Sequence, residues 1–170
     1  MCLSATLLVL CSPFFVVGEG ASLSSQSYKN QVFTHKNVLE VRLLDLQVHF
    51  PENITYKAPK IMVKKLPVLT AHLLIENKSS GPLNELRLAN AENEAYVIDQ
   101  EYGQHAFMSS QNLSDTFRNL GANIPLVDYL HFELATDHLS KVTLVFSLSF
   151  DDENFTVIFR DVPFAYTARK

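Results

Sequence analysis

Cysteine is scarce in this 170-residue chain, and both cysteines, Cys2 and Cys11, lie close to its N-terminus. If that segment is removed, no thiol remains, which excludes disulfides, thiol catalysis and thiolate metal sites together. A secreted domain without disulfides must rest on its hydrophobic core. Because 47% of the residues are hydrophobic, the chain has enough apolar side chains for one such core.

Glycine is also rare, with five in the whole chain, so phosphate-cradling loops are not expected. The sequence has no dinucleotide-binding glycine pattern, no G-x-S-x-G and no H-E-x-x-H. A net charge of −4 offers no basic excess for neutralising phosphates. We therefore expect a protein that is not an enzyme of a common kind, takes no cofactor and binds no nucleic acid.

Long apolar runs are confined to the N-terminus. Residues 3–17 are apolar, and Gly18 and Gly20 supply the small residues of a cleavage site before Ala21. No Lys or Arg precedes the run, so a signal anchor or a buried element of the domain are the alternatives. The run is short for a membrane span and Pro13 interrupts it, which favours a cleaved signal peptide.

This interpretation divides the chain into three parts. We expect a signal peptide over residues 1–20, a polar and flexible segment over residues 21–31, and a single domain over residues 32–170. No later apolar stretch has the length of a membrane helix. The sequence therefore predicts a secreted or endoplasmic-reticulum-lumenal protein, with membrane contact only through a partner or through an anchor missing from a shortened chain.

Four N-glycosylation sequons support the same compartment. Each has the pattern Asn-X-Ser/Thr without proline in the middle, at Asn53, Asn77, Asn112 and Asn154. All four fall at predicted turns or at the starts of strands, where a bulky glycan can be accommodated. Asparagine and serine also collect at turns for conformational reasons alone. We predict that two or more of the four are glycosylated.

Hydrophobic alternation with a period of two dominates the domain. It is clearest at residues 142–150, where five alternate positions are apolar, and it resumes at 155–159 after a short acidic loop, which predicts an antiparallel hairpin. Residues 68–76 also alternate, and short strands are expected at 95–99 and 105–108 around a turn. In 39–50 the phase slips, as in a β-bulge or a bend between two strands.

One short helix is expected among these strands. Leu113, Phe117 and Leu120 recur at helical spacing, and Gly121 is placed to end the helix. Seven to nine short strands without β-α-β spacing predict an all-β fold, an antiparallel β-sandwich that is immunoglobulin-like in its general architecture.

The stretch from Val68 to Leu88, a strand reading LTAHLLIEN followed by a small-residue turn and a second strand, resembles immunoglobulin-like modules. Such modules occur in cell-adhesion and lumenal proteins, including the lumenal domains of translocon-associated proteins. The cysteines and tryptophan of true immunoglobulin domains are absent. The resemblance implies a sandwich and supplies no functional residue.

Two polar clusters have the composition of metal sites. Asp151, Asp152 and Glu153, with Asp161 placed opposite in the hairpin, offer hard oxygen ligands of the kind that calcium prefers. His131, Glu133 and His138 provide ligands for zinc, although a tetrahedral site needs others at suitable distances. We favour a solvated hairpin tip for the first cluster and a half-exposed strand for the second, and so expect no metal.

A lysine cluster opposes the charge of the whole chain. Lys57, Lys60, Lys64 and Lys65 gather four positive charges within nine residues, which is typical of a patch for sulfated glycans or anionic headgroups. Lysines of this kind also protect the edge strand of a sheet, and we favour that interpretation.

These patterns lead to one functional expectation. We expect a secreted or lumenal, N-glycosylated and non-catalytic module that binds a protein partner. The alternatives are an extracytoplasmic subunit or truncated ectodomain of a membrane protein complex and, third, an enzyme of unfamiliar type.

Overall fold

The computed structural model describes residues 24–28, 31–50, 54–55, 62–63, 66–89, 94–113, 118–136 and 138–167. In this part of the chain the secondary structure is almost entirely antiparallel β-sheet. Among the residues that the structure describes, there is no helix with the length and apolarity to span a membrane. The predicted signal peptide and the four lysines of the lysine cluster lie outside the described residues.

Eleven strands join in one hydrogen-bonded path, in the order β1-β3-β6-β11-β9-β8-β12-β7-β10, with β2 added to β3 and β13 added to β12. The strands on the β6 side of β9 are β1 (Ser24–Ser27), β2 (Val32–His35), β3 (Leu39–His49), β6 (Val68–Asn77) and β11 (Pro125–Glu133). Strand β9 (Gln104–Ser110) is followed in the path by β8 (Tyr96–Asp99), β12 (His138–Phe150), β13 (Glu153–Thr167), β7 (Leu83–Ala89) and β10 (Arg118–Leu120). A separate pair consists of β4 (Ile54–Thr55) and β5 (Met62–Val63).

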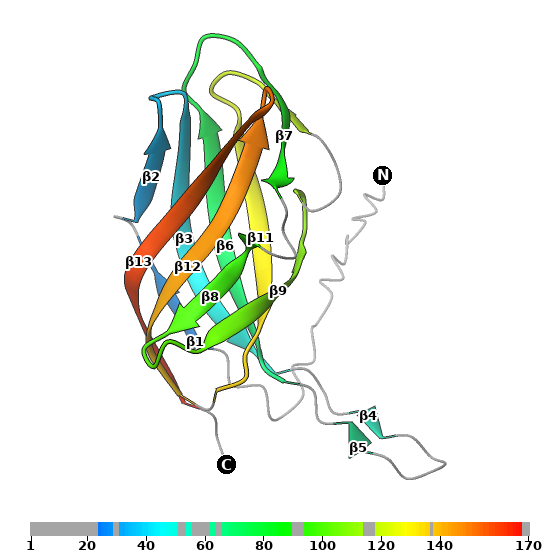
Figure 1. Cartoon of the computed structure of the whole chain (residues 1–170), viewed down its shortest axis with the longest axis vertical. Coiled ribbons are helices and arrows are strands. Elements are labelled where there is room, and N and C mark those ends of the chain that lie inside the picture. Colours follow the sequence, from blue (N-terminus) through cyan, green and yellow to red (C-terminus); the bar gives the residue numbers. More distant parts are fainter. Residues whose placement is uncertain are drawn as a thin grey trace, which may run out of the picture.

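Side chains connect the two parts of this path. In Figure 1, β12 and β13 cross in front of β3, β6 and β11. Phe33 of β2 stacks on Phe155 of β13 with ring centroids 6.1 Å apart, and the hydroxyl of Tyr28 donates to the carbonyl oxygen of Pro163. Apolar residues from both parts form a single buried cluster. Burial of this shared apolar surface is what holds the two parts against each other.

Strand β12 confirms the alternation predicted for residues 142–150. Its five apolar positions are all buried, the most exposed at 6%: Val142, Leu144, Phe146, Leu148 and Phe150. Ser147 and Ser149 on the opposite face are buried as well, at 4% and 5% exposure. The C-terminal half of β12 is therefore buried on both faces, whereas an antiparallel strand often has one face in solvent.

The predicted hairpin is confirmed, and it is longer than the sequence pattern indicated. Strand β13 pairs with β12 from Glu153 opposite Phe150 to Thr167 opposite His138. Asp151 and Asp152 form the two-residue turn with positive φ angles of 45° and 63°. Such turns match the twist of the flanking strands, and aspartate tolerates this conformation better than most residues.

The phase slip in residues 39–50 is a bulge within one strand. Strand β3 runs without a break, and its register against β6 shifts between Leu43 and Asp45. Leu44 is the extra residue, and its side chain is 36% exposed. The alternative of a bend between two strands is therefore wrong.

The predicted short helix is not seen in the described residues. Leu113 lies in a bend, and residues 118–120 form strand β10, which pairs with β7. Leu113 and Leu120 both point into the core, at 0% and 4% exposure. Their apolar spacing therefore reflects two separate insertions into the core, and pairing with the edge of β7 outweighs the local helical pattern.

Because Phe146 is completely buried, Phe146→Ala should lower the free energy of unfolding by roughly 3–5 kcal/mol through lost burial and the cavity left behind. The matched control is Met108→Ala, which shortens a large apolar side chain that is 53% exposed and should cost well under that amount. Urea unfolding of both variants measures the difference. Equal losses would contradict the position of β12 in the core.

Candidate binding groove

A polar groove lies where β8, β12 and β13 meet, next to the turn between β8 and β9. Its volume is about 360 Å³, within the range of small ligand sites. Eight residues line it: Ile98, Asp99, Gln100, Tyr102, Lys141, Thr143, Arg160 and Asp161.

Irregular pairing between β12 and β13 shapes one wall of the groove. The register shifts between Leu139 and Lys141 and again before Leu144. At this place Asp161 has a positive φ of 48°, and Arg160 and Asp161 are both exposed although they are consecutive. In a regular strand one of two neighbours would face inward. The bulges therefore turn two successive charged side chains outward.

An ion pair crosses this wall. Lys141 Nζ lies 2.8 Å from Asp161 Oδ1, and the backbone N–H of Asp161 donates to the hydroxyl of Thr143. The hydrogen bond between Lys141 and Asp161 raises the pKa of Lys141 and lowers the pKa of Asp161. Both side chains are exposed, so the pair contributes little to stability and positions the wall of the groove.

The opposite wall is a turn built around the carboxylate of Asp99. Asp99 Oδ1 accepts hydrogen bonds from the backbone N–H groups of Glu101 and Gly103, each at 2.8 Å. A Cβ atom at position 103 would lie 2.6 Å from Asp99 Oδ2, so only glycine lets the backbone approach the carboxylate this closely. The turn also holds Tyr102 at a positive φ of 66° with its side chain 89% exposed.

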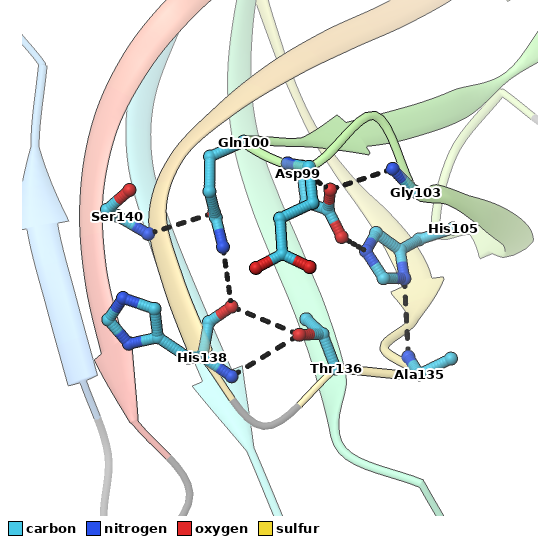
Figure 2. A network of polar contacts seen from close by, with 9 residues as sticks. Asp99, Gln100, Gly103, His105, Ala135, Thr136, His138 and Ser140 are labelled. Atoms are coloured by element: carbon cyan, nitrogen blue, oxygen red, sulfur yellow. Dashed lines mark hydrogen bonds and ion pairs between the residues drawn. The ribbon is translucent and has the colours of Figure 1, made fainter.

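His105 braces this turn from behind (Figure 2). Its Nδ1 accepts a hydrogen bond from the backbone N–H of Ala135 at 3.2 Å, so this nitrogen carries no proton. The proton of the neutral ring is therefore on Nε2, which donates to Asp99 Oδ2 at 3.1 Å. Both ring nitrogens are engaged and the residue is 4% exposed. The Asp99–His105 pair thus ties the β8–β9 turn to the segment after β11 and offers no nitrogen for proton transfer to a ligand.

The pKa of Asp99 follows from these contacts. Desolvation by burial is the largest single effect and raises the pKa of Asp99. The hydrogen bonds from Gly103, Glu101 and His105 act together in the opposite direction, and the pKa of Asp99 is lowered overall. The folded state therefore favours the carboxylate.

Gln100 connects the same turn to the start of β12. Its Nε2 donates to the carbonyl oxygen of His138, and its Oε1 accepts from the backbone N–H of Ser140, both at 3.1 Å (Figure 2). Thr136 also donates to the carbonyl oxygen of His138 at 3.1 Å. These hydrogen bonds connect the turn after β8 and the segment after β11 to the start of β12, beside the groove.

Two side chains of the groove remain available to a ligand. Within the described part of the chain, the guanidinium of Arg160 makes no hydrogen bond or ion pair, and the exposed ring of Tyr102 makes no ring contact. Tyrosine and arginine are enriched at the energetically important positions of protein interfaces. The groove has the features of a binding surface with a rigid base.

The acidic residues of the hairpin do not come together. Glu153 pairs with Lys36 at 2.5 Å and with His35 at 3.1 Å, and Asp151 accepts from Asn84 Nδ2 at 3.1 Å. Asp161 lies in the groove near the middle of β13, well away from the turn. Among the described residues, no group of three or more His, Cys, Asp or Glu side chains is arranged to hold a metal ion.

His131 and His138, two of the residues with the composition of a zinc site, have different hydrogen-bonding partners. His131 Nδ1 lies 2.9 Å from the hydroxyl of Thr70, whereas His138 Nδ1 lies 3.2 Å from the hydroxyl of Thr167. Glu133 is exposed at the end of β11.

The sequons differ in their surroundings. Asn53 lies outside the described residues. Asn77 is completely buried, Asn112 is partly exposed and donates from Nδ2 to the carbonyl oxygen of Val127 at 2.8 Å, and Asn154 is exposed.

Sequence reasoning missed the Asp99–His105 pair. The two short strands and the turn predicted around it are confirmed by β8 and β9. The position of Gly103, four residues after Asp99 in that turn, was the available signal, since glycine allows a close backbone approach and aspartate often bonds to turn amides. The partner Ala135 lies 30 residues away, and no local pattern relates it to His105.

Replacing the carboxylate should expose its role in the turn. Asp99→Asn should lower the free energy of unfolding by about 1–3 kcal/mol at neutral pH, because an amide group would face the N–H of His105. Because the folded state lowers the pKa of Asp99, the unfolded state binds more protons as pH falls, and the contribution of the carboxylate disappears. The difference from wild type should therefore be largest above the unfolded-state pKa of about 3.9 and shrink below it.

Urea unfolding over a pH series measures this difference. The control is Asp161→Asn, which removes an exposed carboxylate and should have little effect at any pH. A difference for Asp99→Asn that stayed constant with pH would contradict the assigned charge.

Comparisons with known proteins give similarity of chain path only. No family model matches the chain, and no curated protein matches its sequence. A functionally unknown protein from Listeria monocytogenes EGD-e is similar over 88% of this chain and 89% of its own, with 12% identity and a TM-score of 0.49. A target of the Northeast Structural Genomics Consortium, SoR45, is similar over 78% of this chain and 88% of its own, with 14% identity and a TM-score of 0.43.

Proposed function

We propose that this chain is a secreted or endoplasmic-reticulum-lumenal N-glycoprotein that binds a protein partner through the groove and catalyses no reaction. For the non-catalytic role of the groove, the supporting observation is the closed Asp99–His105 pair. A general base needs a nitrogen or oxygen that reaches the substrate proton. Both nitrogens of His105 are hydrogen-bonded inside the protein, so the pair acts as a support for the groove.

The architecture that presents the groove is proposed to be a β-sandwich, immunoglobulin-like in its general arrangement. The contacts of Phe33 with Phe155 and of Tyr28 with Pro163 support this, because they join the outer strands of the two parts of the sheet path. In such sandwiches the turns gather at the two ends and carry binding residues.

The chemistry of the groove favours a protein partner. Tyr102 offers an aromatic surface, and Arg160 offers a planar set of donors for carboxylate or carbonyl oxygens. The backbone has a positive φ at Tyr102 and at Asp161, the residue after Arg160. A rigid base lowers the entropy cost of binding, since less conformational freedom is lost on association.

Entry into the secretory pathway is tested on the natural chain. Expressed in a glycosylating cell line, the protein should lose its initial residues and increase in electrophoretic mobility after treatment with a glycan-removing enzyme. Unchanged mobility together with an intact Met1 would contradict the proposal.

The binding surface is tested with a photo-crosslinking residue placed at Tyr102. In the cells that make the protein, this position should yield a discrete crosslinked protein, and Arg160→Ala should reduce the yield. The matched control is the same photo-crosslinking residue at Ile124, which is 60% exposed and does not line the groove. Ile124 follows the turn that bonds to Asn77 at the C-terminal end of β6. Equal products from both positions, or a yield insensitive to Arg160→Ala, would contradict binding through the groove.

A further inference from the structure

Asn77 uses every hydrogen-bonding atom of its side chain. It is the last residue of β6 and is 0% exposed. Its Nδ2 donates to the carbonyl oxygens of Leu120 at 2.9 Å and Gly81 at 2.7 Å. Its Oδ1 accepts from the backbone N–H and the hydroxyl of Ser79, at 2.8 and 2.7 Å. A side-chain amide has two N–H donors and one oxygen with two lone pairs, so its capacity is filled.

An N-linked glycan is incompatible with this arrangement. The sugar replaces one of the two hydrogens on Nδ2, and both hydrogens of Asn77 are already donated. A glycan would therefore break the bond to Leu120 or the bond to Gly81, whose carbonyl oxygen also accepts from the hydroxyl of Ser79, and the sugar would have to fit at a side chain with no exposed surface. A chain modified at Asn77 before folding would not reach the fold described here.

Asn154 presents the opposite situation. It is exposed at the start of β13, just after the two-residue turn, and its side-chain amide makes no hydrogen bond to any residue that the structure describes. Thr156, the hydroxyl residue of the sequon, is also exposed on the same side of the strand. Phe155 between them turns inward and stacks on Phe33 and His35. The acceptor nitrogen of Asn154 is thus accessible, and the packing of Phe155 holds the neighbouring backbone in place.

We propose that glycosylation discriminates between these two sequons: Asn154 is the acceptor, and Asn77 remains an unmodified amide that joins the end of β6 to the β6–β7 turn and to β10. This inference rests on the proposed entry into the secretory pathway.

The position of Asn154 also separates the glycan from the groove. Asn154 lies opposite Ser149 of β12, whereas the groove reaches Thr143 of the same strand. Six residues of extended strand span about 20 Å. A glycan on Asn154 therefore stands at the hairpin end of the molecule and leaves the groove end open to a partner.

Peptide mapping tests the assignment. The full chain is secreted from a glycosylating cell line, once with its own N-terminus and once behind a foreign cleavable leader, and the folded, monodisperse fraction is kept. Enzymatic deglycosylation in water labelled with heavy oxygen converts each glycosylated asparagine to a labelled aspartate. We expect the label at Asn154 and none at Asn77. A label at Asn77 in the folded fraction, or none at Asn154 behind the foreign leader, would overturn the inference.

The two leaders separate this inference from the proposed function. Label at Asn154 behind the foreign leader, without secretion from the chain's own N-terminus, would count against the proposed function while supporting the division between the sequons.

A matched pair of variants tests the structural role of Asn77. Asn77→Asp removes both N–H donors and should lower Tm by several degrees or prevent secretion of folded protein. Asn154→Asp makes the same chemical change at an exposed site and should leave Tm unchanged when both proteins are made in cells that do not glycosylate, because enzymatic deglycosylation would itself convert Asn154 to aspartate. Equal Tm values for the two variants would overturn the role assigned to Asn77, and the label at Asn154 remains the measure if Asn77→Asp does not fold.

Discussion

The structure depends on strand β12, which is paired along both of its edges. One edge bonds to β13 over its whole length, and the other bonds first to β8 and then to β7. With backbone groups satisfied on both sides, the strand brings the largest run of apolar side chains into the core. Deviations from regular pairing are tolerated only near its first residues, where the register against β13 shifts and the groove opens.

Polar side chains with little exposure fix the turns and connections between strands. Asp99 is bonded to two backbone amides and to His105, and Asn77 is bonded to two backbone carbonyls. Asp128, at 0% exposure, accepts from the hydroxyl of Ser110 at 2.6 Å and from the backbone N–H of Asn112 at 2.9 Å. In each case a side chain satisfies backbone groups that the sheet leaves unpaired, because burying them without partners would be costly. The hydrogen bonds of Asp99 hold the turn that forms part of the groove.

The sequence by itself determined the strands. The alternation in residues 142–150 demands one buried face, and any chain that satisfies it as β-structure must pair this segment with neighbours. The slip at Leu44 and the acidic turn after Phe150 were also visible locally, since a bulge changes the phase of the alternation and a two-residue turn needs residues that tolerate positive φ. These features depend on residues that are neighbours in the chain.

Only the tertiary structure decided the rest, because the deciding partners are distant in sequence. Leu113 and Leu120 have helical spacing, yet residues 118–120 pair with β7 as a strand. His105 accepts a hydrogen bond from Ala135, and the sequon asparagine Asn77 donates one to the carbonyl oxygen of Leu120, 43 residues away. A sequence motif records which atoms are present, whereas burial and hydrogen bonding decide which of them remain available.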